Sequence, residues 1–215
     1  MTLQDDLDDT VHLTKLTQQE LDVILGRHEA FVNAERDGER MQLGMHDLSY
    51  MDMEGRDLSR AELTGAVMSN CNLEGATLND TILFATDLRY SNLSNTELNH
   101  ADLRGACLAG ADLSGAKMND VDMRDGVLLR SAAEGGDLTP LVHEEANAGM
   151  EKTTLKGADM TGAKVAANLI VQTDMTDCIL KNASFKGANL SMSNLTGCDL
   201  EGADFTDANL SGAIF

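Results

Sequence analysis

The sequence predicts an all-β solenoid, a rod of stacked coils assembled from five-residue units. A Leu, Met or similar apolar residue recurs at every fifth position from Leu43 to Leu128, and again from Leu155 to Phe215. A small residue such as Ala61 usually stands two positions before it, and Asp or Asn often lies between the two. Helices repeat every ~3.6 residues and strands every two, so a period of five requires a turn within each unit. Such units return the chain to equivalent positions only if they form a coil.

The quintets Ala-Asp-Leu-Arg-Gly at 101–105 and Ala-Asp-Leu-Ser-Gly at 111–115 resemble the A(D/N)LXX motif of pentapeptide-repeat proteins, as does Ala-Asn-Leu-Ser at 188–191 and 208–211. The resemblance implies a right-handed quadrilateral parallel β-helix, with four quintets per coil and the Leu and small residues inside. Coils spaced like paired strands, about 4.8 Å apart, would number about eight and form a rod roughly 37 Å long. Since no coil can bury its own faces, stability must come from stacking.

Residues 1–40 form an acidic N-terminal segment that contains a predicted helix over 17–36. Thr17 and Glu20 make a capping box, and Asp37-Gly38 ends the pattern. The apolar stripe of this helix comprises Leu21, Ile24, Leu25, His28, Phe31 and Val32. The next coil is irregular, because its small inward positions hold Met41, His46, Met51 and Arg56. We expect the helix to cap this first coil; the alternative is a free helix that binds a partner.

The solenoid divides into a first block at 41–130 and a second block at 153–215, separated by an inserted loop at 131–152. The separation of Leu128 and Leu155 is not a multiple of five, so the chain must leave the rod between them. Pro140 is suited to begin a short helix within the loop. The loop either carries function, as loops often do, or is a tolerated insertion.

One face of the rod is predicted to carry an apolar strip. If the rod resumes on the next face, the face that holds Leu128 next receives Ile170. The outward residues of this face are then Tyr50, Val67, Tyr90, Val127, Leu129, Leu169 and Val171. Either the loop residues Leu138, Leu141, Val142 and Met150 cover this strip, or the strip binds a partner, since contiguous exposed apolar patches usually mark contacts.

The sequence offers no pattern typical of an enzyme or a metal site. Cys71, Cys178 and Cys198 occupy small inward positions and are predicted to be core residues, whereas Cys107 points outward as a free thiol. No Cys-x-x-Cys occurs, the histidines lack ligand spacing, and no nucleophile and base stand out from the repeat. We therefore expect a non-catalytic protein without a cofactor.

The formal charge of −20 disfavours binding to nucleic acid or anionic membranes, because phosphates would be repelled. It permits basic protein partners. No apolar run is long enough to span a bilayer and the first residues are acidic, so we expect a cytoplasmic protein without membrane contact.

Two functions fit these features. The first is a protein-interaction or scaffold module that uses its faces, its loop and its open end. The second follows from the resemblance, which implies rods that mimic DNA and bind a type II topoisomerase such as DNA gyrase, to inhibit or protect it. An acidic face with Asp52, Glu54, Glu74 and Asp112 would carry that activity. The charge density of the regular body lies well below that of duplex DNA, which has about one charge per 1.7 Å.

The C-terminal coil is predicted to form a homodimer. Nothing in the sequence after Phe215 would cover the last coil, which Leu200, Phe205, Leu210 and Phe215 line. An uncapped end presents apolar side chains and unpaired backbone groups, and pairing two ends about a two-fold axis would close both. The alternative is a frayed end with Phe215 folded inward. The resemblance implies that family members acting on gyrase dimerise through a C-terminal helix. This chain ends in a coil instead.

Overall fold

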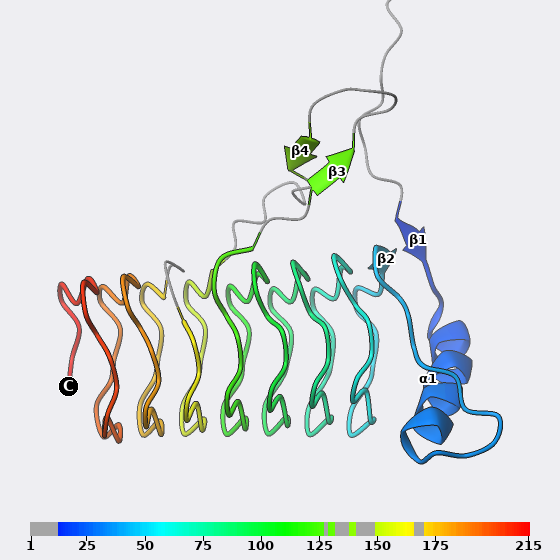
Figure 1. The fold of residues 1–215 in the computed structure, drawn as a ribbon, viewed down its shortest axis with the longest axis horizontal. Coiled ribbons are helices and arrows are strands. Elements are labelled where there is room, and N and C mark those ends of the chain that lie inside the picture. The colour runs from blue at the N-terminus through cyan, green and yellow to red at the C-terminus, as the bar shows by residue number, and fades with distance from the viewer. Residues whose placement is uncertain (1–12, 127–128, 132–137, 141–148, 166–169) are drawn as a thin grey trace, which may run out of the picture.

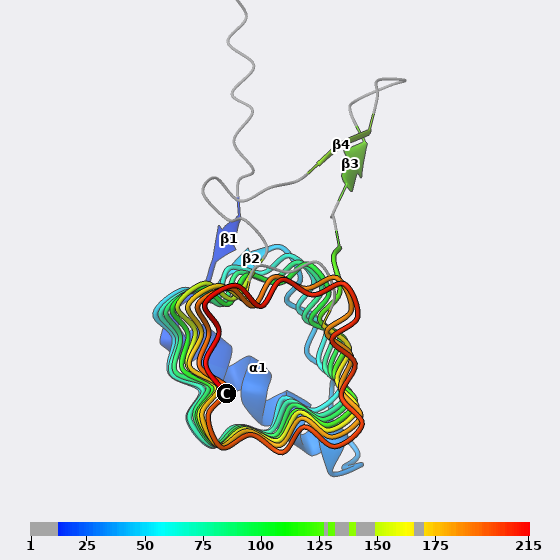
Figure 2. The same cartoon turned by 90° about the vertical axis from the view of Figure 1, so that its left-hand side faces the viewer.

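The structure is a computed structural model, which describes residues 13–126, 129–131, 138–140, 149–165 and 170–215. Figure 1 shows a rod of stacked coils with the helix α1 at its N-terminal end and the final coil at the other. Viewed along the rod in Figure 2, the coils superpose on a four-sided outline. The expected right-handed quadrilateral β-helix is confirmed.

Away from the insertion each coil takes up 20 residues, because the outward residue before each inward apolar residue pairs in parallel with the residue 20 places on. Gln42 pairs with Glu62, Glu62 with Ile82 and Ile82 with Asp102. The backbone N–H groups follow the same ladder: Leu63 N donates to Ile82 O at 2.9 Å. Each side of a coil is therefore one quintet, as the motif implied.

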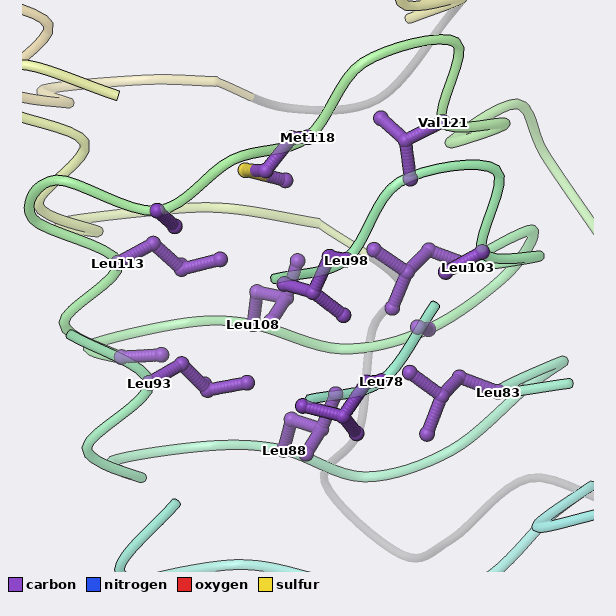
Figure 3. Packing of buried hydrophobic residues seen from close by; sticks show 14 of the residues in the cluster. Leu78, Leu83, Leu88, Leu93, Leu98, Leu103, Leu108, Leu113, Met118 and Val121 are labelled. Carbon is purple, nitrogen blue, oxygen red and sulfur yellow. The ribbon is translucent and has the colours of Figure 1, made fainter. Parts of the chain in front are cut away.

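Four columns of apolar side chains fill the rod, one behind each face, and nearly all are fully buried. Figure 3 shows Leu78 stacked on Leu98 and Leu83 on Leu103. Face 1 is defined by Leu43, Leu63, Leu83, Leu103, Met123, Val165, Phe185 and Phe205, and face 2 by Leu48, Met68, Leu88, Leu108, Met150, Ile170, Leu190 and Leu210. Face 3 is defined by Met53, Leu73, Leu93, Leu113, Leu155, Met175, Leu195 and Phe215, and face 4 by Leu58, Leu78, Leu98, Met118, Met160, Leu180 and Leu200.

The corners explain the Asp and Asn of the motif. The Asp112 carboxylate accepts from Ser114 N at 2.9 Å and from Ser114 Oγ at 2.6 Å, which fixes the turn at the end of the quintet. The next residue, Gly115, has φ +69°, in the left-handed region where only Gly, Asn and Asp are readily accepted. The sequence pattern thus encodes the turn directly.

The small inward positions allow the corner to close, and several of them also bond to the preceding coil. Thr86 Oγ1 donates to Leu63 O at 2.9 Å and Cys71 Sγ to Leu48 O at 3.0 Å, in each case 23 residues earlier. Cys71 and Cys178 are buried core residues, and Cys198 is partly buried in the same role. The hydroxyl or thiol at these positions therefore donates an additional hydrogen bond to a backbone carbonyl of the preceding coil, which an Ala could not do.

The N-terminal helix α1 spans Gln18–Val32 and begins with the predicted capping box of Thr17 and Glu20. It is shorter than the predicted 17–36. Ala34 adopts the left-handed conformation at φ +56°, and Glu35 N bonds back to Ala30 O at 2.8 Å. This closure ends the helix several residues before Asp37-Gly38, because a left-handed residue cannot continue it.

The helix caps the first coil, as predicted. Leu21, Leu25 and His28 are fully buried, and the Gln18 side chain pairs with both backbone groups of Asp52, at 2.8 and 2.9 Å. Arg56, an irregular residue at a small inward position, binds Glu29 through two hydrogen bonds of 2.6 and 3.0 Å. Nearby, strand β1 (Thr14–Lys15) pairs in parallel with β2 (His46–Asp47) on the first coil.

The interruption lies earlier in the chain than predicted. Cys107 pairs with Gly149, which lies 22 residues beyond the regular 20-residue register, and Met150 follows Leu108 in the core. The coil thus resumes at Gly149, not at residue 153. Ile170 does fall on face 2, but after Met150. Leu128 lies outside the described residues.

Within the interruption, strands β3 (Leu129–Ser131) and β4 (Leu138–Pro140) form an antiparallel hairpin. Leu129 therefore belongs to the insertion and not to the first block. Pro140 ends a strand, and the short helix expected after it falls on 141–148, outside the described residues.

Candidate functional site

The most exposed apolar side chains among the described residues lie on the corner row that follows face 2. We name the outside of face 2 together with this row the insertion face. The corner row comprises Tyr50, Asn70, Tyr90, Gly110, Lys152, Gln172, Met192 and Gly212. Tyr50 is 75% exposed, Tyr90 65% and Met192 63%, which are the largest exposures of apolar side chains in the described residues. Elsewhere the outer surface is mainly polar.

The three exposed side chains occupy an unfavourable backbone conformation. Tyr50 has φ +66°, Tyr90 +60° and Met192 +62°, a region that large side chains rarely adopt. The ring of Tyr90 lies against the next coil, where a Cβ on Gly110 would come within 2.6 Å of the ring. A bare glycine therefore makes room for this tyrosine.

The outward row of face 2 combines buried charge with small residues. Asp87 is almost completely buried and accepts hydrogen bonds of 2.9 and 2.8 Å from the Arg89 guanidinium and of 3.1 Å from Arg89 N. Its neighbour Cys107 is a free thiol, as expected, but it is buried, with only 4% of the residue exposed. Its direction is outward, but its surroundings cover it, and burial raises the pKa of the thiol. At the N-terminal end, Lys15 lies 3.2 Å from Asp47.

The acidic residues expected on one face do share face 3. Asp52 leads a ladder of paired positions through Asn72 and Asn92 to Asp112, with Glu54 and Glu74 beside it. Two of the carboxylates are bridged by an amide, because Asn72 Nδ2 donates to Asp52 at 3.0 Å and to Glu54 at 3.1 Å. Beyond Asp112 the ladder continues with Thr154, Asp174, Asn194 and Ile214. Asp52, Glu54, Glu74 and Asp112, which we name the acidic cluster, thus lie in the N-terminal half of the face.

The final coil is open in the described chain. Phe205 stacks on Phe185 inside the rod, with ring centroids 5.2 Å apart, so it serves the core as well as the end. Leu210 is half-buried, whereas Phe215 is 59% exposed and is not folded inward.

A family model of pentapeptide repeats matches eight copies, over residues 47–80, 81–120 and 178–215. These segments make up more than half of the sequence. The chain belongs to the pentapeptide-repeat family. A comparison with curated protein sequences gives no significant match.

Solved pentapeptide-repeat structures resemble this protein to different degrees. HetL from the cyanobacterium Nostoc sp. strain PCC 7120, a protein involved in heterocyst differentiation regulation, is 26% identical, with a TM-score of 0.63. The match covers 81% of this chain and 78% of HetL. The protein alr5209 from Nostoc PCC 7120 is 30% identical over 50% of this chain and 84% of its own, with a TM-score of 0.40. Full-length QnrB1, a plasmid-mediated fluoroquinolone resistance protein, is 17% identical over 78% of this chain and 74% of its own, at 0.34.

The structure of this pentapeptide-repeat protein brings part of the predicted apolar strip together. Tyr50, Tyr90 and Val171 lie on the insertion face, while Leu129 and Leu138 lie in the β3–β4 hairpin. Val127, Leu141, Val142 and Leu169 fall outside the described residues. Figures 1 and 2 show the hairpin on the same side as β2 and away from the coils. Tyr50 and Tyr90 themselves are exposed.

The described part of the pentapeptide-repeat rod contains no cluster of three His, Cys, Asp or Glu side chains that could hold a metal ion. A pocket of about 210 Å³ lies between α1 and the first coil, lined by Ile24, Arg27, Glu39, Arg40, Met41, Gln42 and Leu43. Its volume is below the ~300 Å³ at which small-molecule sites begin. Among the described residues, no helical segment has the length and apolar character needed to cross a membrane.

Proposed function

We propose that this pentapeptide-repeat protein is a non-catalytic interaction module that binds a protein partner along its insertion face. One observation carries the proposal: Tyr50 and Tyr90 are exposed at left-handed corners, where the fold itself favours Gly, Asn or Asp. A large side chain in this backbone region destabilises the fold by on the order of 1 kcal/mol. Residues with such backbone strain are concentrated at functional sites.

The chemistry of the face indicates the kind of partner. Tyrosine is enriched at the energetic centres of protein interfaces, since its ring gives a large apolar contact and its hydroxyl a polar one. Coils about 4.8 Å apart place the two corners about 10 Å from each other, a distance that one helix or strand of a partner can span. The protein's charge of −20 favours a partner whose apolar contact is bordered by Lys and Arg.

The hairpin adds a second element on the same side. Figure 1 shows β3 and β4 projecting from the side that carries β2. A partner seated on face 2 would meet this hairpin, as loops positioned by a rigid scaffold commonly provide contacts. Binding would then depend on both the corner tyrosines and the insertion.

The test replaces the two tyrosines by the residue that suits their backbone best. Tyr50→Asn with Tyr90→Asn removes both rings while the left-handed corner is kept or relieved, so the fold should remain at least as stable. Affinity capture with the 215-residue protein should identify a partner whose affinity falls at least about tenfold in this variant. His100→Asn is the matched control, because His100 is exposed at φ +61° on the diagonally opposite corner row.

Equal recovery of every partner by the wild type and the double variant would contradict the proposal. So would an equal loss with His100→Asn, because it would point to a general effect of corner substitution.

The acidic cluster of face 3 supports a second candidate, a rod that mimics DNA and binds a type II topoisomerase. The Asp52 and Glu54 carboxylates accept hydrogen bonds from the same Asn72 amide, and Glu74 lies on the next coil. Competition with DNA would be largely electrostatic, so inhibition of gyrase supercoiling should weaken as salt rises. Lysine substitutions of the three residues should abolish inhibition, whereas the tyrosine variant should retain it. No effect at micromolar protein would eliminate this candidate.

A further inference from the structure

Two of the four cysteines are stacked on each other in the same column. The small inward positions behind the corner before face 4 hold Ala116, Ala158, Cys178 and Cys198 in successive coils. The two cysteines are in register, because their neighbours Ile179 and Asp199 pair directly and Asp199 N donates to Cys178 O at 2.9 Å.

The spacing of the coils suits a covalent link. Adjacent coils lie about 4.8 Å apart, and disulfides join Cα atoms separated by about 4.4–6.8 Å. Both side chains also point the same way. Cys178 Sγ donates to Leu155 O and Cys198 Sγ to Met175 O, each at 2.9 Å, and these two carbonyls are themselves on adjacent coils.

The S–H···O bond alone does not account for the pair. Cys71 makes the same bond to Leu48 O, yet its column neighbours are Met51 and Ser91, so it has no second thiol beside it. The environments of the paired thiols also differ, because Cys178 is buried and Cys198 is partly exposed in the 215-residue chain. Interaction between them raises the pKa of the Cys178 thiol and lowers that of Cys198.

We propose that Cys178 and Cys198 form a redox-responsive pair that closes into a disulfide between the last two complete coils, with a small-molecule disulfide such as oxidised glutathione as the oxidant. The Cys198 thiolate attacks one sulfur of the oxidant, whose S–S bond breaks and releases one thiolate. Cys178 then loses its proton and attacks Cys198 Sγ in the mixed disulfide, which expels the second thiolate. Two protein thiols are oxidised and one small disulfide is reduced to two thiols.

The disulfide would join residues 20 positions apart and hold the final coil to its neighbour. Opening of that coil to solvent, which a terminal repeat undergoes most readily, would become less frequent. The consequence is a C-terminal end whose order depends on the surrounding redox state.

The experiment exposes the folded, reduced 215-residue protein to oxidised glutathione and measures intact mass and peptide mass. Trypsin cleaves after Lys181 and Lys186, so the two cysteines fall on separate peptides. We expect the loss of two hydrogen atoms, a linked pair of peptides containing Cys178 and Cys198, and slower hydrogen exchange over 195–215.

Cys178→Ser should stop at the mixed disulfide, because no second thiol displaces glutathione from Cys198. Serine suits this place, since Ser193 makes the equivalent bond to Ile170 O in another column. Cys71→Ser is the control and should oxidise like the wild type. A wild-type protein that keeps glutathione on Cys198, remains fully reduced, or links other cysteines would overturn the proposal.

Discussion

His28 is a buried side chain whose two ring nitrogens meet different surroundings. Nδ1 accepts a hydrogen bond from Met41 N at 3.0 Å, so the proton of the neutral ring must sit on Nε2, a buried atom without a hydrogen-bond partner among the described residues. The histidine thus joins α1 to the first coil only while it is neutral. Burial lowers its pKa, although the backbone of Leu58 and the nearby Asp57 and Glu29 carboxylates oppose that shift.

The sign of the pH dependence follows from this lowered pKa. Below about pH 6.5 the unfolded chain binds a proton at His28 that the folded protein binds less readily, so stability falls as the pH decreases. Urea unfolding of the wild type and of His28→Leu between pH 8 and pH 5 should show a steeper loss in the wild type. Parallel pH profiles for the two proteins would mean that His28 does not contribute.

At the scale of elements, α1 covers the end of the first coil, where a preceding coil would otherwise pack. Leu25 is fully buried against that coil, whereas Val23 is 59% exposed on the outer side of the same helix. Leu25→Ala should cost about 2–5 kcal/mol through the lost contacts and the cavity. Val23→Ala should cost under about 0.5 kcal/mol.

Because a solenoid is stabilised by contacts between neighbours, the effect of Leu25→Ala should be local. Hydrogen exchange monitored by mass spectrometry should accelerate first over 41–60 and last in the central coils. Uniform acceleration along the rod would contradict the role of α1 as a cap for the first coil.

The insertion can be removed without a change in register. Joining Gly126 to Gly149 deletes 127–148 and places Gly149 directly beside Cys107 after a regular 20-residue coil. This variant should keep the thermal stability of the rod. A second variant, in which only 129–148 is deleted, keeps two more residues than the first. Its coil is two residues too long, so this variant should melt at a lower temperature. Equal melting temperatures for the two deletions would show that the register is not restored in this way.

The regular part of the fold could be predicted from the sequence because each column repeats the same physical requirement. The inward Leu, the small corner residue and the Asx turn recur with a fixed period. A few of these residues are therefore enough to assign every regular residue to its face of the coil. The exit point could not be predicted. Leu128 and Met150 are equally suitable inward residues, and a loop taken as 127–148 or as 131–152 preserves the register equally well.

The candidate site was predictable only in part. Tyr50 and Tyr90 fall on one row once the 20-residue coil is known, and the sequence singled them out. Met192 lies on the same row and was missed, although an apolar residue in place of the usual Gly or Asn was a visible signal. The column pattern predicted the outward direction of Cys107 but not its burial, because burial depends on surrounding side chains that the pattern does not contain.

At the scale of the whole molecule, the final coil predicts self-association of the 215-residue chain. Phe215, at the end of the inward column of face 3, is 59% exposed, and pairing two such ends would bury it. Sedimentation at micromolar concentration should show a dimer, and Phe215→Asp should give a monomer. Val23→Asp, at an equally exposed site on α1, should leave the dimer intact. A wild-type protein that stays monomeric at high concentration would refute the interface.

The proposal that the insertion face is the binding surface is tested most directly by hydroxyl-radical footprinting of the protein with its captured partner. Tyrosine and methionine side chains react readily with the radical, so Tyr50, Tyr90 and Met192 report on this face directly. We predict that bound partner reduces the labelling of Tyr50 and Tyr90 and leaves the acidic cluster of face 3 unchanged. Unchanged labelling of both tyrosines, with protection of face 3 or face 4 instead, would contradict the proposal.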